Sequence, residues 1–155
     1  SALKAESCVY LHRDSDMATQ RTEIIIETKR QGLHLITREV AEALARFQND
    51  GPALLNLFIK HTSASLLIQE NASPSARADL EEFINRLAPE NQSWHRHLDE
   101  GPDDTASHLK SAVTPTSLTV PVNGTRLDLG TWQGIYLWEH RRHPHRRKIV
   151  LTLLN

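Results

Sequence analysis

Alternation of apolar and polar residues along the chain predicts a series of short β-strands. Successive side chains of a strand point to opposite faces, so apolar residues at every second position mark a buried face. Leu55, Leu57 and Ile59 show this spacing clearly. The segments with strand character are 21–28, 33–36, 53–60, 65–70, 117–122, 126–140 and 147–154. The turn at 29–32 predicts that the first two form a hairpin, and Asn123-Gly124 predicts another.

Three other segments repeat their apolar residues with the period of an α-helix, at about 38–47, 74–87 and 103–113. Thr37 is a suitable N-cap for the first of these helices. Ser73-Pro74 predicts the start of the second, because Pro is favoured at the first helical position. Asp103 or Asp104 can cap the third. Helices mixed with strands, and hairpin turns between the strands, predict an α+β fold with largely antiparallel sheets.

The segment 129–141 has two unlike faces when it is interpreted as a strand. One face carries Gly130, Trp132, Gly134, Tyr136, Trp138 and His140, and the other carries Leu129, Thr131, Gln133, Ile135, Leu137 and Glu139. We assign Trp132, Tyr136 and Trp138 to packing in the core or between subunits. Thr131 and Gln133 are then candidates for the wall of a pocket.

Length and composition narrow the class of protein. The chain has 155 residues, which suits one domain. We expect this domain to span residues 17–155, with residues 1–16 an N-terminal extension or a cloning remnant. A single Cys excludes an internal disulfide and a Cys-based zinc finger.

Charge and hydropathy give no indication of nucleic acid or membrane as a partner. Lys and Arg total 18 against 19 Asp and Glu, so no net field attracts a polyanion. No run of 18 apolar residues is present, so the sequence predicts no membrane-spanning helix and favours a cytoplasmic protein. Basic residues nevertheless gather at 141–148, which indicates a local anion site.

Asp104 and His108 are the strongest candidates for chemistry. They lie four residues apart on a predicted helix, and their side chains therefore share one face. A carboxylate beside an imidazole raises its basicity and fixes its orientation, as in a general base or a metal site. The other interpretation is a helix-capping Asp with a surface His nearby.

A second candidate set follows the apolar strand 53–60. His61, Ser63 and Ser65 combine an imidazole with hydroxyls at a strand end, which suits a phosphate or carboxylate. They can equally be a strand-end His bonded to the backbone and two turn-forming Ser residues. A Ser nucleophile is disfavoured because no G-x-S-x-G segment is present.

Five further residues are candidates for a site, and three of them have both a functional and a structural interpretation. Asp79 lies at the edge of a helical apolar stripe, where a carboxylate needs a catalytic or a structural partner. Asn71 is either a pocket residue or a turn residue before a helix. Arg141 offers the forked donors that bind phosphate, although the basic segment can also be a solvated turn. His95 and His97 could face one metal, but their spacing has low specificity.

Five segments taken together resemble the YjbQ-like family, whose members are described as secondary thiamine-phosphate synthases. They are HTSASLLIQEN (61–71), DLEEF (79–83), EGPDDTASHLK (100–110), SLTVPV (117–122) and LGTWQGIYLWEHR (129–141). The similarity runs from about residue 17 to residue 155. The chain departs from the family at Thr105-Ala106, where Met-Pro is common, and the family varies around His140.

The resemblance implies a sandwich of two mostly antiparallel sheets with three helices, assembled as a homotrimer. It implies a pocket near the subunit boundary, formed by His61, Ser63, Asn71, Asp79, Asp104, His108, Thr131 and Gln133. The implied reaction joins hydroxymethylpyrimidine diphosphate to thiazole phosphate and releases pyrophosphate, and it can be a side activity.

Our mechanistic hypothesis assigns roles to these residues. The catalytic residues are His61, Asp79, Asp104 and His108, and the substrate or phosphate ligands are Ser63, Ser65, Asn71, Thr131, Gln133 and Arg141. A divalent metal, magnesium or zinc, would be bound by Asp104, His108 and His61, with no organic cofactor. The partners are a small phosphorylated or anionic substrate and further copies of the chain. Two other functions stay open, a metal-dependent hydrolase and a non-catalytic trimeric protein that binds a metal or anion.

Overall fold

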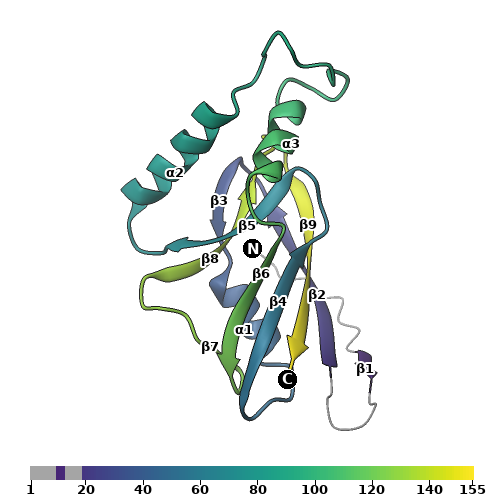
Figure 1. Ribbon diagram of the computed structural model, residues 1–155, viewed down its shortest axis with the longest axis vertical. Helices are drawn as coiled ribbons and strands as arrows, with labels where there is room; N and C mark the ends of the chain where they lie inside the picture. The colour runs from purple at the N-terminus through teal and green to yellow at the C-terminus, as the bar shows by residue number, and fades with distance from the viewer. Residues whose placement is uncertain (1–9, 13–18) are drawn as a thin grey trace.

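Two antiparallel β-sheets of unequal size form the fold (Figure 1). The larger sheet has the strand order β1-β2-β9-β4-β6-β7 and the smaller has the order β3-β8-β5. The strands are β1 Tyr10–His12, β2 Thr19–Thr28, β3 Gly32–Leu35, β4 Pro52–Ile59, β5 Ala64–Glu70, β6 Ser117–Asn123, β7 Arg126–Leu127, β8 Gln133–Glu139 and β9 His145–Leu154. The helices are α1 Thr37–Leu44, α2 Pro74–Leu87 and α3 Asp104–Ala112. The predicted α+β class with mostly antiparallel sheets is confirmed.

The structure is a computed structural model that describes residues 10–12 and 19–155. The proposed extension at 1–16 therefore lies outside the described residues, except for β1, which pairs with β2. No helix in the described part of the chain is long and apolar enough to cross a membrane.

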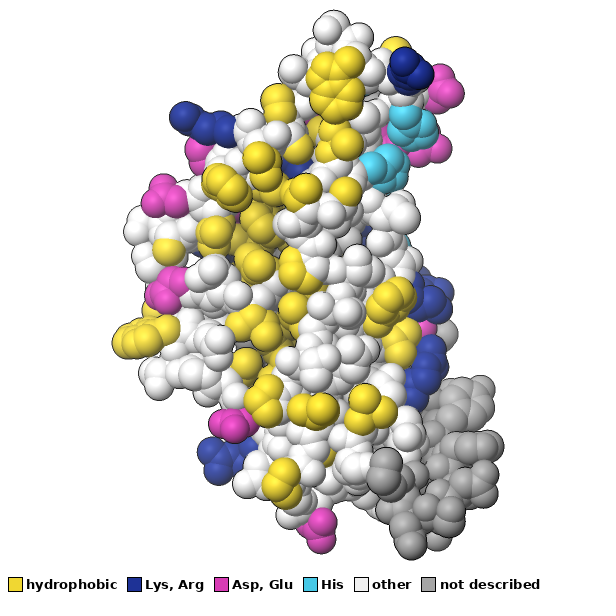
Figure 2. All heavy atoms as spheres, in the orientation of Figure 1, with side chains coloured by type: hydrophobic (Ala, Val, Ile, Leu, Met, Phe, Trp, Pro, Cys, Tyr) yellow, Lys and Arg dark blue, Asp and Glu magenta, His cyan; other side chains and the backbone are white. Residues whose placement is uncertain are grey.

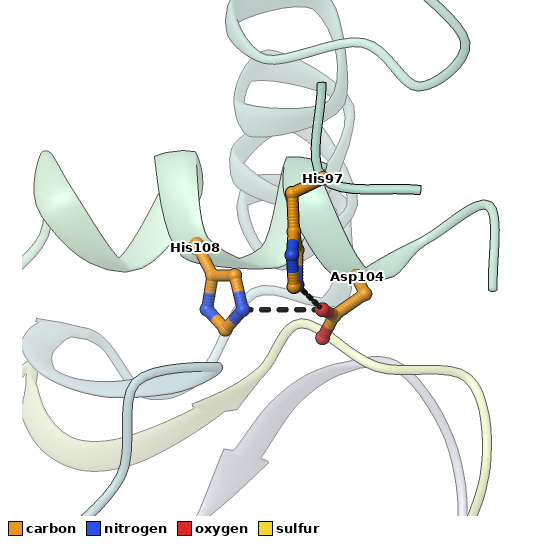
Figure 3. Close-up of side chains that lie close together, drawn as sticks. All are labelled: His97, Asp104 and His108. Atoms are coloured by element: carbon orange, nitrogen blue, oxygen red, sulfur yellow. Dashed lines mark hydrogen bonds and ion pairs between the residues drawn. The ribbon is translucent and has the colours of Figure 1, made fainter. Parts of the chain in front are cut away.

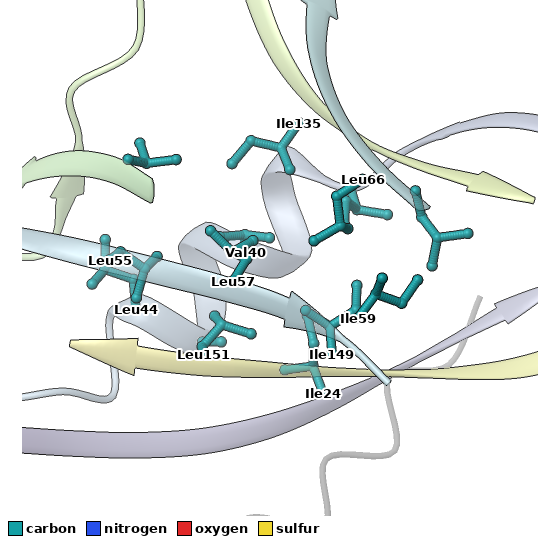
Figure 4. Packing of buried hydrophobic residues seen from close by; sticks show 14 of the residues in the cluster. Ile24, Val40, Leu44, Leu55, Leu57, Ile59, Leu66, Ile135, Ile149 and Leu151 are labelled. Carbon is teal, nitrogen blue, oxygen red and sulfur yellow. The ribbon is translucent and has the colours of Figure 1, made fainter. Parts of the chain in front are cut away.

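The main core lies between the two sheets and includes α1 (Figure 4). Leu55, Leu57 and Ile59 of β4 are fully buried, as their alternation predicts. They pack in one cluster with Val40 of α1 and Ile135 of β8. Complete burial of such a side chain contributes roughly 1.5–3 kcal/mol. This core holds both sheets in a fixed relation to each other, and so it positions the loops at their ends.

A smaller core covers the other face of β8. Tyr136 and Trp138 pack there with Leu33 of β3 and Ile84 of α2. The assignment of these two aromatic residues to a core is therefore confirmed. Trp132 is different, because it lies in the loop before β8 and is 65% exposed.

Two connections differ from the sequence prediction. The segment 126–140 is not one strand, because β7 belongs to the larger sheet and β8 to the smaller. The segments 21–28 and 33–36 do not form a hairpin, since β3 pairs with β8. At Gly32 the chain crosses between the sheets with a φ of +117°, and an added Cβ would lie 2.5 Å from a carboxylate oxygen of Glu81. The second predicted hairpin is confirmed, with a φ of +59° at Gly124 between β6 and β7.

Of the three predicted N-cap side chains, only one caps its own helix. Ser73 accepts a hydrogen bond from the Ala76 amide at 3.3 Å, with Pro74 as the first residue of α2, as predicted. Thr37 is not the N-cap of α1, because its hydroxyl accepts from the Ile135 amide of β8 at 2.9 Å. Asp103 occupies the N-cap position of α3, but its carboxylate does not cap the helix.

Candidate metal centre

Three side chains converge at the start of α3 (Figure 3). The Nε2 atoms of His97 and His108 lie 2.6 Å and 3.2 Å from Oδ2 of Asp104. One ligand atom from each residue lies within 4.8 Å of the others. Asp104 and His108 are one helical turn apart, as predicted, whereas His97 comes from the loop that joins α2 to α3. The three residues therefore form a group of potential metal ligands.

The hydrogen bond at the other nitrogen of His108 fixes its orientation. Nδ1 of His108 lies 2.9 Å from the Thr62 carbonyl oxygen. A carbonyl can only accept, so Nδ1 donates the proton, and a neutral His108 then has a lone pair on Nε2. That lone pair faces a carboxylate oxygen, an arrangement that is favourable only when a proton or a cation lies between them. Metal-binding imidazoles are commonly held in this way by a carbonyl behind the ring.

Arg141 holds the carboxylate of the group in place. Its Nη1 donates to Oδ1 of Asp104 at 2.6 Å, its Nε to Oδ2 of Asp103 at 3.1 Å and its Nη2 to the Glu100 carbonyl at 2.8 Å. Arg141 therefore leaves Oδ2 of Asp104 directed at the two imidazoles. With these three bonds the guanidinium is engaged by protein acceptors, and its role as a phosphate ligand stays a prediction.

The charges around Asp104 favour its ionised form. Burial alone would raise the pKa of the Asp104 carboxyl, but the hydrogen bond from His97 and the neighbouring His108 and Arg141 side chains lower it below its ordinary value. Two imidazoles and an ionised carboxylate are a typical donor set for zinc, with one position left for water or substrate. Magnesium prefers oxygen ligands, so the donor set favours zinc of the two metals considered.

A groove of about 700 Å³ reaches the group at His108. Its lining includes Phe58, Lys60, His61 and Thr62. Nε2 of His61 accepts from the Lys148 amide at 2.8 Å. Burial, assisted by the charge of Arg147, lowers the pKa of His61. His61 thus lies beside His108 in the groove. It is not one of the three converging side chains, because the third potential ligand beside Asp104 and His108 is His97.

Ser63 and Ser65 are engaged inside the protein. The Ser63 hydroxyl accepts from Nη2 of Arg147 at 2.9 Å, and the Ser65 hydroxyl bonds Nε2 of His140 at 2.9 Å. Burial, with the charges of Lys110 and Arg147, lowers the pKa of His140 to about 3. Neither Ser lines the groove, because both hydroxyls bond buried side chains.

Asn71, Thr131 and Gln133 gather at the other end of the smaller sheet. The Asn71 amide donates to the carbonyls of Thr131 and Gln133 at 3.2 Å and 3.3 Å. Glu70 pairs with Gln133 at this end of β5 and β8, whereas Ala64 pairs with Glu139 at the end near Thr62. The length of β8 separates the two ends by about 20 Å at ~3.3 Å per residue. These three residues therefore do not meet His108 within one copy of the chain.

Asp79 does not have the buried partner that its place in the sequence indicated. Its side chain is exposed on α2, and no hydrogen bond or ion pair joins it to another residue of the described part of the chain. Exposure removes the need for a partner, because a carboxylate in water keeps its hydration.

Sequence reasoning undervalued His97. It paired His97 with His95 by alternation, whereas the folded loop directs His97 to Asp104 and packs His95 against Trp94. No periodic signal in residues 89–102 could separate these two histidines, because that connection is neither a helix nor a strand.

Comparisons with known proteins match the chain to a single protein family. A family model described as UPF0047 protein YjbQ-like matches residues 22–155. The UPF0047 protein YjbQ of Salmonella typhimurium is 47% identical over 134 residues, which cover 86% of this chain and 96% of that protein. The UPF0047 protein YugU of Bacillus subtilis is 39% identical over 119 residues, which cover 77% of this chain and 87% of that protein.

Solved structures show the same similarity. A conserved hypothetical protein of Thermus thermophilus aligns with a TM-score of 0.73 and 35% identity, covering 83% of this chain and 97% of the other. A YbjQ-like protein of unknown function from Sulfolobus solfataricus aligns with a TM-score of 0.79 and 25% identity, covering 90% and 99%.

Proposed function

The chain belongs to the UPF0047 family of YjbQ-like proteins, and we propose that it is a metal-dependent enzyme that acts on a small phosphorylated substrate. One observation carries the proposal, the convergence of His97, Asp104 and His108 next to an open groove. The hydrogen bond from His108 to Thr62 and the ion pair of Arg141 with Asp104 hold two of these ligands before a metal arrives. Such preorganisation is typical of a metal site that is built into a fold.

His97, Asp104 and His108 would hold the ion, which supplies charge neutralisation for a departing phosphate or pyrophosphate when it is bound. The groove beside His108 is lined by an aromatic side chain, Phe58, and by Lys60, whose ammonium group lies 3.3 Å from the Glu23 carboxylate. A heterocycle that carries a phosphate has matching chemistry, because its ring is apolar and its phosphate is anionic.

The reaction that we propose is formation of thiamine phosphate from hydroxymethylpyrimidine diphosphate and thiazole phosphate, with release of pyrophosphate. The family resemblance supports the reaction, and the donor set and the groove support its metal and its substrate class. In this role Lys60 and Thr62 receive a phosphate oxygen, while His61 contributes a neutral imidazole to the groove.

Product analysis tests this function directly. The two precursors are incubated with the protein, with zinc, with magnesium and without metal, and thiamine phosphate and pyrophosphate are both quantified. We expect product with metal, and its loss in H97A and H108A. H143A is the matched control, because His143 is an exposed His outside this group. No thiamine phosphate from the metal-loaded wild type would contradict the proposal.

A metal-dependent hydrolase is the second candidate, favoured by the partial exposure of His97 and His108. An open ligand position can hold a water molecule, which a metal activates. The same assay separates the two functions. A hydrolase releases phosphate or pyrophosphate from either precursor alone, whereas the transferase requires both. Zinc binding without any turnover would favour the non-catalytic function.

We also propose that the protein is a homotrimer. Apolar side chains form a band on the face that carries α2 and α3 (Figure 2). Phe83 and Leu87 of α2 are 59% and 55% exposed in a single copy. Exposed apolar area of this kind commonly marks a contact between proteins. Light scattering tests the assembly, and a monomer mass would refute it.

A further inference from the structure

The two histidines that line the groove present opposite groups to it. Nδ1 of His108 donates to the Thr62 carbonyl, which leaves the lone pair on Nε2. At His61 the bond to the backbone is made by the other nitrogen, because the Lys148 amide donates to Nε2 at 2.8 Å. An amide N–H can only donate, so the proton of a neutral His61 is on Nδ1. His108 therefore offers a lone pair and His61 offers an N–H group.

A ligand in the groove can reach the N–H group of His61. Nδ1 of His61 makes no hydrogen bond to another described residue, and it is not one of the sealed side-chain atoms that lack a partner. The residue is partly exposed, and its side chain lines a groove of about 700 Å³. Nδ1 is therefore open to the groove, whereas Nε2 is occupied by the backbone.

The surroundings keep the His61 ring neutral. A second proton on Nε2 would break the hydrogen bond from the Lys148 amide, because two donors would then face each other. Burial is the main reason that the pKa of His61 lies below its ordinary value, and the charge of Arg147 adds to it, while Glu139 opposes it. His145 and Lys148 lower this pKa further. His61 is therefore a donor at neutral pH, and its only lone pair is already in use.

The charges around the groove allow an anionic ligand. The lining contains Lys60 and no Asp or Glu. The Lys60 ammonium group lies 3.3 Å from Glu23, and Lys148 adds an exposed positive charge. The carboxylate of the metal centre, Asp104, is paired with Arg141. Each of these carboxylates has a positive partner, so the groove does not repel an anion.

We propose that His61 is a specificity-determining residue, a fixed N–H donor that binds an oxyanion of the ligand through Nδ1. The oxyanion is a carboxylate or a tetrahedral group, since both offer a negatively charged acceptor oxygen. The assignment rests on the proposed function for its catalytic meaning, because a donor beside a metal stabilises charge that develops on a substrate oxygen. In this role His61 is not a general base.

NMR of the imidazole nitrogens tests the donor without metal or substrate. The spectrum of the full chain is compared with that of H61A, which identifies the His61 signals. We expect a neutral ring with its proton on Nδ1 at neutral pH. A proton on Nε2 would overturn the proposal.

An NMR titration with acetate and with sulfate tests binding, on the full chain with and without zinc. H61N and H61Q are a matched pair, because Asn places its amide nitrogen near the position of Nδ1 and Gln near that of Nε2. We expect H61N to bind within about threefold of the wild type and H61Q to bind about tenfold more weakly or worse, because a hydrogen bond to a charged group is lost. A role in packing alone would not separate the two amides.

The donor and the metal centre fail in different ways. A wild type that does not bind zinc would contradict the metal-dependent enzyme, while the tautomer and the titration without zinc would still test His61. The donor is overturned if neither ion binds the wild type, if H61Q binds as the wild type does, or if both variants lose binding equally. Tighter binding of sulfate would support a tetrahedral oxyanion, and tighter binding of acetate would support a carboxylate.

Discussion

Replacing Arg147 by Met should destabilise the fold by about 3–5 kcal/mol. Arg147 donates through Nε and Nη2 to the two carboxylate oxygens of Glu139, at 2.9 Å and 2.5 Å, and Glu139 has no exposed area. The Thr28 hydroxyl is a further donor to Glu139, at 2.6 Å. Met keeps the length of the Arg stem, so the main effect is a buried carboxylate without its counter-ion.

The loss is large enough to measure by two methods. For a chain of this size ~1 kcal/mol lowers Tm by about 2–4 °C, so we expect a decrease of roughly 6–20 °C. Urea denaturation followed by tryptophan fluorescence gives the free energy of unfolding directly. The double variant R147M/E139L should recover at least half of the loss, because it removes the buried charge as well.

R146M is the matched control. Arg146 is the adjacent residue on β9, it is exposed, and its Nε lies 3.8 Å from Glu27. An exposed pair of this kind contributes about 1 kcal/mol or less. If R147M unfolds within ~1 kcal/mol of the wild type, the reasoning about the buried pair is wrong.

Three further predictions concern the metal, the pH and α2. Zinc at a hundredfold excess over its Kd should stabilise the wild type by about 2.7 kcal/mol in thermal unfolding, and this shift should disappear in H97A and H108A but persist in H61A. Because the pKa of His140 is lowered to about 3 from 6.5, only the unfolded state binds this proton at mildly acidic pH, so stability should fall as pH drops below 6.5. Between pH 7 and pH 5 the wild type should lose about 2 kcal/mol more than H140Q in urea denaturation, and an equal loss would contradict the assignment. D79A should unfold within ~0.5 kcal/mol of the wild type, so a loss of turnover without a loss of stability would assign Asp79 to a site shared with another copy.

Parts of the fold that depend on near neighbours in the chain could be predicted from the sequence. The alternation at Leu55, Leu57 and Ile59 identified a buried strand face, and Ser73-Pro74 identified the start of α2. The spacing of Asp104 and His108 brought their side chains together because one helical turn fixes that distance.

Predictions that depended on distant partners were less successful. Thr37 resembles a helix cap, but its hydroxyl accepts a hydrogen bond from the amide of Ile135, which lies 98 residues further along the chain. Arg141 and Arg147 belong to one basic segment, yet Asp104 engages the first and Glu139 the second. A local pattern cannot show which of several arginines meets a carboxylate from another element.

The sequence by itself determined the class of fold, most of the local elements and two of the three potential metal ligands. Short-range geometry dictates these features, since strand alternation and helical spacing place side chains without reference to the rest of the chain. Only the tertiary structure decided that His97, and not His61 or His95, completes the group, and that β3 and β8 share a sheet. These choices depend on how the two sheets pack around one core, because that packing brings an irregular loop next to α3.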